Sequence, residues 1–291
     1  MTRNWQPCRI CQGLGIIFRP SGNSRLIKVL DLCDCVLQHC SSCPGDKKPP
    51  YYYYDADHNK LMACPCRPAR LRYEKTLQLL QQSKIPKKFL YRRLVDFETK
   101  SDSEIEEQYR LVALDEARQT IEQFQHQEGE RRGLYIFGPP GTGKTLLGCI
   151  ILNELAMRYL LPVRYVKITR DFFNRIRNTF ISESQEYGQA ESIFRELAEV
   201  EVLLLDDFGV QADSAWEQRT LYDLIDIRYE NEKATIITSN TSLSEAGKDL
   251  VGTTLNAGLV SMYQRIISRL REMTTEVKLI TTDYREKREF G

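Results

Sequence analysis

Long apolar runs are absent from this sequence. No stretch of eighteen or more apolar residues occurs among its 291 residues, and the first ten, MTRNWQPCRI, contain no apolar segment of the kind that directs secretion. We therefore expect no membrane partner and a cytoplasmic location. The formal net charge is only +1, yet residues 1–75 hold twelve Lys and Arg against six Asp and Glu. This local excess of positive charge favours an anionic partner surface at that end of the chain.

Cysteine is almost absent beyond residue 66. Of the nine cysteines only Cys149 lies there, inside the apolar stretch TLLGCIILNELAMRY, where a lone cysteine acts as a small hydrophobic residue. The other eight form close pairs within the first 66 residues. Because a reducing cytoplasm disfavours disulfides, such pairs indicate metal ligands rather than cross-links.

The paired cysteines form a repeat. The pattern C-x2-C followed by C-x-C occurs twice, with offsets of 32, 32, 31 and 31 residues between the copies, and each copy supplies the four sulfurs of a closed tetrahedral zinc site. Residues 16–32 and 47–63, between the pairs, each have the pattern strand, turn, strand. The sequence therefore predicts two zinc ribbons that hold two Zn²⁺, with the ligands Cys8, Cys11, Cys33 and Cys35 in the first copy and Cys40, Cys43, Cys64 and Cys66 in the second.

The cysteine spacing is compatible with other assignments. A redox dithiol system or disulfides would not require a duplicated spacing, so both are weaker interpretations. The spacing also permits Cys8 and Cys11 to share a metal with the second C-x-C pair. His39 and His58 lie in the same region, but four sulfurs already complete each set, so neither histidine is needed as a ligand.

A phosphate-binding loop follows near the middle of the chain. Residues 138–145, GPPGTGKT, match G-x-x-x-x-G-K-[ST] and lie between a short apolar strand at 134–137 and an apolar helix. The loop amides and the helix N-terminus favour phosphate, Lys144 can reach the terminal phosphates, and Thr145 can ligate Mg²⁺. We predict that ATP or ADP is bound by Gly138, Pro139, Pro140, Gly141, Thr142, Gly143, Lys144, Thr145 and Leu146.

Two later strand ends carry polar groups that suit this site. The apolar run in EVEVLLLDDFGV indicates a strand buried on both faces of a parallel sheet, and the carboxyl ends of such strands border the active site. Asp206 is predicted to lie near Mg²⁺, and Asp207 to orient or deprotonate the attacking water. Asp207 has a shorter side chain than a glutamate would have in this role, so it is less well placed to reach the attacking water. We therefore expect slow hydrolysis. The strand at 234–238 ends close to Asn240, which is predicted to sense the γ-phosphate.

Residues 258–273, GLVSMYQRIISRLREM, have the pattern of an amphipathic helix. Arg265 and Arg269 lie together along the edge of its apolar stripe, whereas Arg271 points to solvent. An arginine at such an edge can cover the stripe with its methylene stem, or it can supply a cation for phosphate chemistry. The stripe consists of Leu259, Met262, Tyr263, Ile266, Ile267, Leu270 and Met273.

Six blocks of the sequence occur in the order found in one protein group: IPKKFLYRRLVDFE, GPPGTGKT, LLLDDFG, WEQRTLYDLIDIRYENEKATIITSN, RIISRLREM and DYR. Over residues 83–288 the chain resembles the AAA+ ATPases of the DnaC/DnaI helicase-loader and IstB transposition-helper group. The resemblance implies that Arg269 is an arginine finger reaching a neighbouring subunit's nucleotide and that Arg285 is a second sensor near the γ-phosphate. It also implies an ATP-dependent oligomer and the strand order 5-1-4-3-2.

The expected fold is therefore α/β, an AAA+ P-loop NTPase preceded by a small double zinc-ribbon domain. We divide the chain into the tandem zinc-ribbon domain at 1–75 and the ATPase domain at 76–291, joined by a helix near 70–84. Helical patterns alternate with five strands, which predicts a parallel sheet between helices. The strands are expected near 134–137, 163–168, 201–206, 234–238 and 277–281.

The resemblance implies a loader of the replicative helicase. In this hypothesis residues 1–75 dock on a DnaB-type helicase, as the zinc-binding domain of the DnaI branch does, the ATPase ring binds single-stranded DNA, and ATP hydrolysis drives release. The alternative is an IstB-type ATPase that regulates a transposase on duplex DNA. A P-loop enzyme that phosphorylates a small molecule is a third hypothesis, but the sequence contains no acceptor or lid motif in its favour.

Two aromatic segments are candidates for contact with nucleic acid. In residues 166–180, aromatic and basic side chains suited to base stacking and phosphate contacts are Phe172, Phe173, Lys167, Arg170, Arg175 and Arg177. Packing in the core explains the two phenylalanines equally well. The four tyrosines at 51–54 can stack on nucleic acid or on a partner, although packing on their own hairpin is favoured.

Overall fold

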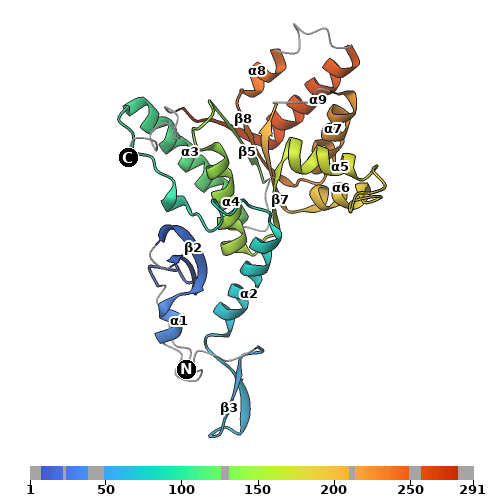
Figure 1. Cartoon of the computed structure of the whole chain (residues 1–291). Helices are drawn as coiled ribbons and strands as arrows, with labels where there is room; N and C mark the ends of the chain where they lie inside the picture. Colours follow the sequence, from blue (N-terminus) through green and yellow to red (C-terminus); the bar gives the residue numbers. More distant parts are fainter. Residues whose placement is uncertain are drawn as a thin grey trace.

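Five strands pair in parallel in the computed structural model, which describes residues 8–21, 24–38, 49–125, 131–209, 214–248 and 257–280 (Figure 1). Read from β9, the sheet has the predicted order 5-1-4-3-2, so the predicted AAA+ sheet is confirmed. The last strand begins three residues before the predicted 277–281, because the preceding helix leads into it without a loop. The strands are β6 (Val163–Lys167), β7 (Val202–Phe208), β8 (Ala234–Ser239), β5 (Gly133–Phe137) and β9 (Thr274–Lys278).

Helices cover both faces of this sheet. Alternate side chains of a strand point to opposite faces, so Leu204 and Ile236 join one apolar cluster whereas Leu203 and Ile237 join the other. Three layers result, with the carboxyl ends of the parallel strands at one edge. The first face is covered by α3 (Glu104–Glu122) and α4 (Lys144–Tyr159), and the second by α6 (Ala190–Glu199), α7 (Ala215–Glu230) and α9 (Ala257–Met273).

The helix that follows the phosphate-binding loop is packed tightly against the sheet. A Cβ on Gly148 would lie 2.9 Å from the side chain of Leu204, so a glycine is what permits α4 to approach β7 this closely. Cys149 is fully buried in α4, and burial raises its pKa well above the usual value. This confirms that the lone cysteine acts as a small hydrophobic residue.

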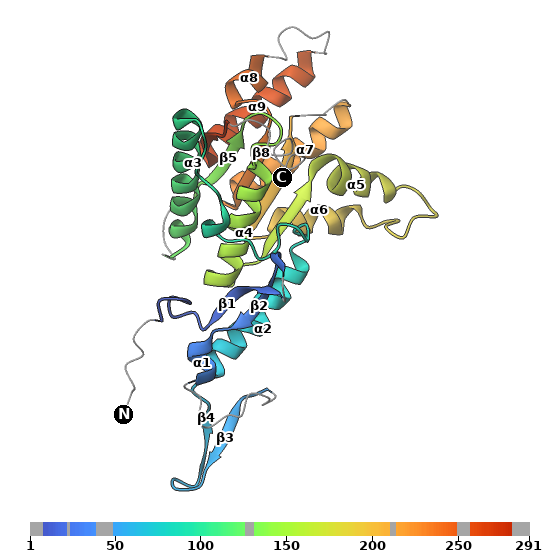
Figure 2. The ribbon, with the colours of Figure 1, turned by 60° about the vertical axis from the view of Figure 1, so that its left-hand side comes forward.

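Both predicted N-terminal hairpins are present. β1 (Ile16–Ser21) pairs with β2 (Ser24–Leu32), and β3 (Tyr52–Asp55) pairs with β4 (Lys60–Ala63), each pair antiparallel. A short helix, α1 (Asp34–Gln38), follows the first hairpin. Figure 2 shows the first hairpin beside α2 (Arg67–Gln82) and the second projecting away from the ATPase core.

The first hairpin shares its apolar core with the ATPase part. Ile16, Phe18 and Leu30 belong to the same buried cluster as Leu79 of α2 and Leu134 of the central sheet. The connecting helix, predicted near 70–84, is observed as α2 at 67–82, and the proposed domain boundary at 75/76 lies inside it. The hairpin is thus seated on the ATPase core through side chains from both sides of this boundary.

Shorter elements complete the described part of the chain. They are η1 (Leu94–Asp96), η2 (Gln123–Gln125), a π-helical turn η3 (Ile168–Phe173), α5 (Asn174–Asn178) and α8 (Leu243–Lys248). The acidic loop near residue 100 leads into α3, and Ser103 caps the helix by accepting a hydrogen bond from Glu106 N. In the described segments, none of the helices combines the length and apolar character that a membrane crossing requires.

Candidate functional site

The phosphate-binding loop lies where β5 passes into α4. A Cβ on Gly138 would lie 1.8 Å from the Leu279 carbonyl oxygen, so only glycine fits between the loop and the segment after β9. Gly143 has φ of 94° and begins α4 from the left-handed region. Lys144 is buried, and its Nζ donates to the carbonyl oxygens of Gly138 and Pro139 at 2.7 Å each. The lysine therefore folds over its own loop, and its ammonium group lies where the loop curls.

The Asp206 carboxylate accepts hydrogen bonds from hydroxyl groups on three different elements. Thr145 Oγ1 donates to Asp206 Oδ1 at 2.7 Å, which brings the two predicted Mg²⁺ ligands together. Thr238 Oγ1 on β8 donates to the same oxygen at 2.6 Å, and Tyr165 on β6 donates to Oδ2 at 2.8 Å. Burial and the Asp206 carboxylate raise the pKa of Tyr165, so this hydroxyl stays a donor. Hydroxyl and carboxylate oxygens are ligands that suit Mg²⁺.

The sequence prediction missed Tyr165 and Thr238. Thr238 belongs to a strand whose carboxyl end was already assigned to the site, so its hydroxyl was a usable signal. The sequence around Tyr165 gave no such signal, because an aromatic residue on a strand is ordinarily a packing residue. Only the pairing of β6 with β7, which aligns Lys167 with Asp206, brings the Tyr165 hydroxyl to the acidic strand end.

Asp207 points away from its neighbour. The register between β7 and β8 shifts after Leu205, and Asp207 has φ of 62°. Such a bulge re-aims a side chain at a strand end. The Asp207 carboxylate pairs with Lys167 Nζ at 2.6 Å, and both side chains are partly exposed. The candidate catalytic carboxylate is therefore paired with a cation of its own chain.

Asn240 is exposed immediately after β8. The residue before it, Ser239, accepts a hydrogen bond through its backbone oxygen from Gly138 N at 3.2 Å. The end of β8 thus adjoins the first glycine of the phosphate-binding loop. This is the position at which the sequence predicted a phosphate sensor.

Arg269 contacts α7 of its own chain. Its guanidinium forms an ion pair with Asp226 and lies over the rings of Tyr222 and Tyr229, with Cζ 5.0 and 5.6 Å from their centroids. Of the predicted apolar stripe of α9, Tyr263, Ile266, Ile267 and Leu270 are buried, which confirms the helix assignment. Arg265 and Arg271 are exposed, and Arg285 lies outside the described residues.

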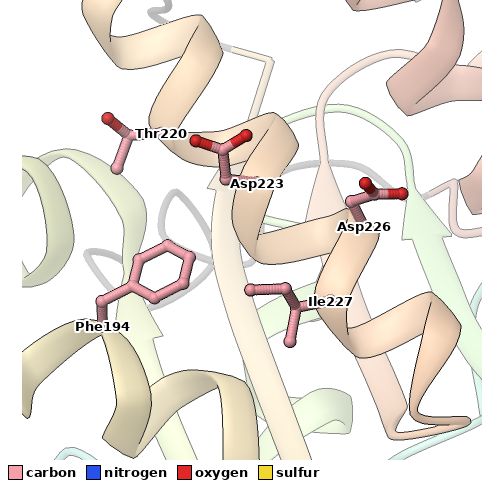
Figure 3. Close-up of a pocket in the computed structure, with 5 residues that line it drawn as sticks. All are labelled: Phe194, Thr220, Asp223, Asp226 and Ile227. Carbon is pink, nitrogen blue, oxygen red and sulfur yellow. The ribbon is translucent and has the colours of Figure 1, made fainter. Parts of the chain in front are cut away.

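A surface groove of about 430 Å³ opens beside Asp226 (Figure 3). Phe194 of α6 and Ile227 supply its apolar lining, and Thr220, Asp223 and Asp226 of α7 supply its polar one. Figure 3 shows the phenyl ring directed toward α7 and both carboxylates on that helix. None of these residues belongs to the phosphate-binding loop.

Four of the predicted zinc ligands lie together. The Sγ atoms of Cys8, Cys11, Cys33 and Cys35 are all within 4.8 Å of one another. The Cys8–Cys33 and Cys11–Cys35 pairs are separated by 3.8 and 3.6 Å. A tetrahedral site with Zn–S bonds of about 2.3 Å places sulfurs about 3.8 Å apart, so these thiols fit one zinc ion. The C-x2-C pair thus gathers with the C-x-C pair of its own copy.

The second set is described only in part. Cys64 and Cys66 are buried with their Sγ atoms 3.2 Å apart, whereas Cys40, Cys43 and His39 lie outside the described residues. His58 is exposed and pairs with Asp55. The structure therefore supports one zinc site by geometry and shows half of the ligands proposed for the other.

The four consecutive tyrosines have different environments. Tyr51 is buried, donates to Glu74 and lies under Arg70. Tyr52 and Tyr54 are exposed on one face of the β3–β4 hairpin, the latter to 62%. Tyr51 therefore packs against α2 rather than on its own hairpin, whereas Tyr52 and Tyr54 are exposed.

The residues between β6 and α6 correct one hypothesis. Phe172 and Phe173 are completely buried, so core packing is the right interpretation and base stacking by these rings is wrong. The exposed aromatic side chains nearby are instead Phe180 and Tyr187, which were not among the predicted contacts. The four predicted cations have carboxylate partners in this chain: Lys167 with Asp207, Arg170 with Asp171, Arg175 with Glu186 and Arg177 with Glu217.

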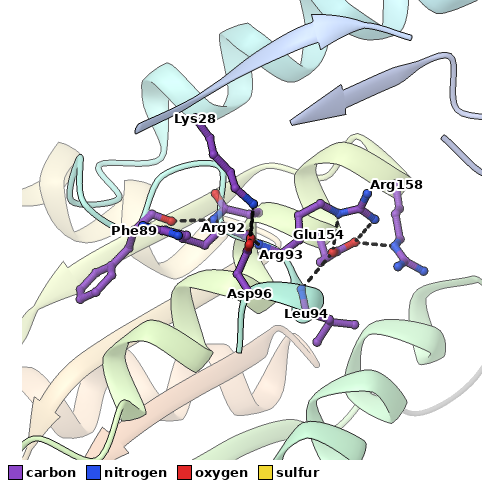
Figure 4. A network of polar contacts seen from close by, with 9 residues as sticks. Lys28, Phe89, Arg92, Arg93, Leu94, Asp96, Glu154 and Arg158 are labelled. Carbon is purple, nitrogen blue, oxygen red and sulfur yellow. Dashed lines mark hydrogen bonds and ion pairs between the residues drawn. The ribbon is translucent and has the colours of Figure 1, made fainter. Parts of the chain in front are cut away.

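A polar network joins the first hairpin to the ATPase core (Figure 4). Lys28 of β2 pairs with Asp96, and the Asp96 carboxylate also accepts from Arg93 N at 2.8 Å. Arg93 and Arg158 both pair with Glu154 of α4, which is buried. Burial raises the pKa of Glu154, but these two arginines outweigh it and hold the pKa below its usual value. The carboxylate is therefore ionised and satisfied inside the protein.

A phosphate-binding loop at the end of the first strand, an acidic end on a buried strand and the sheet order 5-1-4-3-2 define an AAA+ P-loop ATPase fold. Residues 74–289 match the family described as IstB-like ATP binding protein. Since the match covers most of the chain, the chain belongs to this family.

Individual relatives agree with this assignment. The chain is 30% identical over 140 residues to the replicative helicase loader DnaC of Escherichia coli strain K12, which is 47% of this chain and 53% of that protein. It thus spans about half the length of the curated relatives it matches. The DnaI crystal structure matches 68% of this chain and 96% of its own, with a TM-score of 0.55 and 22% identity. The crystal structure of the DnaC helicase loader matches 67% of this chain and 100% of its own, with a TM-score of 0.51 and 25% identity.

Proposed function

We propose that this chain is an ATP-dependent loader of the replicative DNA helicase. The contact between Thr145 and Asp206 carries the nucleotide part of the proposal, since it joins the phosphate-binding loop to the acidic strand end. The similarity to the helicase loader DnaC supports the loading part. In this role ATP binding assembles the loader, and hydrolysis drives release.

The nucleotide would displace contacts that the loop makes with itself. Lys144 would exchange the carbonyls of Gly138 and Pro139 for the terminal phosphates. Thr145 and Asp206 would hold Mg²⁺, which neutralises phosphate charge when bound. Asp207 would orient the attacking water and Asn240 would contact the γ-phosphate. Because Asp207 is a short side chain paired with Lys167, slow turnover is expected.

A neighbouring copy would complete the site. Arg269 is the proposed arginine finger and Arg285 the second sensor, so full activity requires an ATP-dependent oligomer. A finger supplied in this way contributes roughly 10³ to 10⁵ in rate in related phosphate-transfer switches.

The N-terminal part would dock on a DnaB-type helicase. We assign residues 1–75 to this head and 76–291 to the ATPase domain, and we propose two Zn²⁺, the second held by Cys40, Cys43, Cys64 and Cys66. The projecting β3–β4 hairpin, with Tyr52 and Tyr54 exposed, offers an accessible surface for the helicase.

Single-stranded DNA would be bound by the segment after β6. Its exposed aromatic side chains, Phe180 and Tyr187, can stack on bases, which the buried Phe172 and Phe173 cannot. Arg170 is largely exposed and can reach a phosphate while keeping its contact with Asp171.

A second candidate is an IstB-type ATPase that regulates a transposase on duplex DNA. The match of residues 74–289 to the IstB-like family favours it. The N-terminal cysteine cluster favours the loader, in keeping with the zinc-binding head of the DnaI branch.

One experiment separates the two. The full-length zinc-replete chain is mixed with a hexameric DnaB-type helicase and a circular single strand, and loaded helicase is counted after ATP addition. Loading by the parent chain and none by Lys144→Ala is the expected result. If the chain does not bind the helicase but forms length-dependent assemblies on duplex DNA, the regulator is the correct function.

A further inference from the structure

Three residues on one face of α7 hold the guanidinium of Arg269. Tyr222, Asp226 and Tyr229 are spaced i, i+4, i+7, so they line up along the helix. Arg269 of α9 pairs with the carboxylate of Asp226 and lies over both rings. Tyr222, Asp226 and Tyr229 are here termed the α7 latch.

These contacts occupy the group that a neighbouring nucleotide would need. The side chains of Arg269 and Asp226 are only 25% and 23% exposed, so their attraction is screened less than that of a surface pair. Ring faces add a favourable interaction with the cation. Arg269 Nε is buried and has no hydrogen-bond partner among the described residues, which leaves one donor unused. Arg269 is therefore neutralised within its own subunit while part of its hydrogen-bonding capacity stays free.

The groups around Asp226 favour its ion pair with Arg269. Asp223 lies one turn earlier and lines the same groove (Figure 3). Burial raises the pKa of Asp223, Arg219 lowers it, and the Asp226 carboxylate raises it, so Asp223 has a cation of its own beside it while the two carboxylates repel each other. Glu272 adds a third carboxylate nearby through its hydrogen bond from Tyr229. Removal of Arg269 would take from Asp226 the cation that it pairs with, beside two other carboxylates.

We infer that the α7 latch positions Arg269 on its own subunit and releases it only to the triphosphate of a neighbouring copy. This inference rests on the proposed function, in which Arg269 acts in trans. A triphosphate carries several negative charges and Asp226 only one, so the triphosphate can displace Asp226 as the partner of Arg269. A diphosphate lacks the terminal group and competes less well. The latch thus makes assembly depend on ATP rather than on ADP.

The test is the protein concentration at which the full-length zinc-replete chain assembles, measured by sedimentation velocity with ATP, with ADP and without nucleotide. Asp226→Asn keeps the side-chain size and removes the charge. We expect its assembly midpoint in ATP to fall about fivefold or more, and assembly in ADP to become detectable. Asp226→Glu keeps the charge and should behave like the parent.

Asp223→Asn is the matched control, since it removes a carboxylate of the same groove that has no ion pair with Arg269 among the described contacts. Its midpoint should stay within about twofold of the parent. The latch is wrong if Asp226→Asn, folded as judged by its thermal transition, assembles at the parental concentration or a higher one.

Arg269→Ala distinguishes this failure from failure of the proposed function. If Arg269→Ala loses DNA-stimulated turnover while Asp226→Asn assembles like the parent, Arg269 is the arginine finger but the α7 latch does not control it. If Arg269→Ala hydrolyses ATP normally on DNA, the finger assignment itself fails, and the latch fails with it.

Discussion

Lys28 Nζ lies 2.5 and 2.6 Å from the two carboxylate oxygens of Asp96, and this ion pair connects the first hairpin to the ATPase core. The next residue, Phe97, lies 3.6 Å from the position that a Cβ on Gly143 would occupy. Two consecutive residues therefore contact the hairpin on one side and the phosphate-binding loop on the other.

Lys28→Met tests how firmly the hairpin is seated. Both partners are mostly buried, so the variant removes an ammonium group from a poorly solvated Asp96 carboxylate. We expect the free energy of unfolding in urea to fall by about 1.5–3 kcal/mol, with faster proteolysis within residues 8–38. Lys60→Met is the control, because Lys60 is exposed on β4, and it should change stability by about 0.5 kcal/mol or less. Equal effects of the two variants would show that Lys28 contributes only as a surface charge.

Tyr165→Phe tests the hydroxyl that the sequence did not identify. The variant removes one of the three hydrogen bonds to Asp206 and keeps the ring. We expect stability to fall by about 1 kcal/mol and the Mg²⁺ concentration needed for half-maximal turnover to rise several-fold, because the carboxylate is less well oriented. Tyr159→Phe, on the far end of α4, should leave the Mg²⁺ dependence unchanged. An unaltered Mg²⁺ requirement in Tyr165→Phe would remove this residue from the site.

Metal analysis tests the two zinc sites separately. The parent chain should contain two zinc ions, and Cys33→Ser and Cys64→Ser should each contain one, because three sulfurs do not close a structural site. Cys149→Ser is the matched control and should retain both ions, since Cys149 is buried in α4. A parent chain with a single zinc that Cys64→Ser retains would contradict the second site.

Phe172→Ala and Phe180→Ala form a matched pair. Phe172 is completely buried, so its truncation should lower the free energy of unfolding by about 3–5 kcal/mol. Phe180 is 69% exposed, and its truncation should leave stability within about 0.5 kcal/mol. Single-stranded DNA affinity should nevertheless fall in Phe180→Ala by about 1–3 kcal/mol if a base stacks there. Unchanged affinity, measured by fluorescence anisotropy, would exclude Phe180 from DNA contact.

Structural features formed by residues adjacent in the sequence could be predicted. The phosphate-binding loop needs its glycines, lysine and threonine side by side, and β7 begins with an unbroken apolar run, so both could be predicted from the sequence. The order of the strands in the sheet followed from the family resemblance. The cysteine repeat likewise predicted the hairpins and the cluster of Cys8, Cys11, Cys33 and Cys35. The prediction of β9 was displaced by three residues because no turn separates it from α9.

Contacts between distant segments depended on the folded chain. The sequence has no local pattern that brings Tyr165 to Asp206, Lys28 to Asp96 or Asp226 to Arg269, since each pair is joined by packing of elements far apart in the chain. The burial of Phe172 and exposure of Phe180 likewise follow from the direction in which the π-helical turn leaves β6. Local patterns specify which elements form and which chemistry they carry. Tertiary packing decides which side chains meet, because one apolar or charged residue suits many partners until the backbone places it beside one.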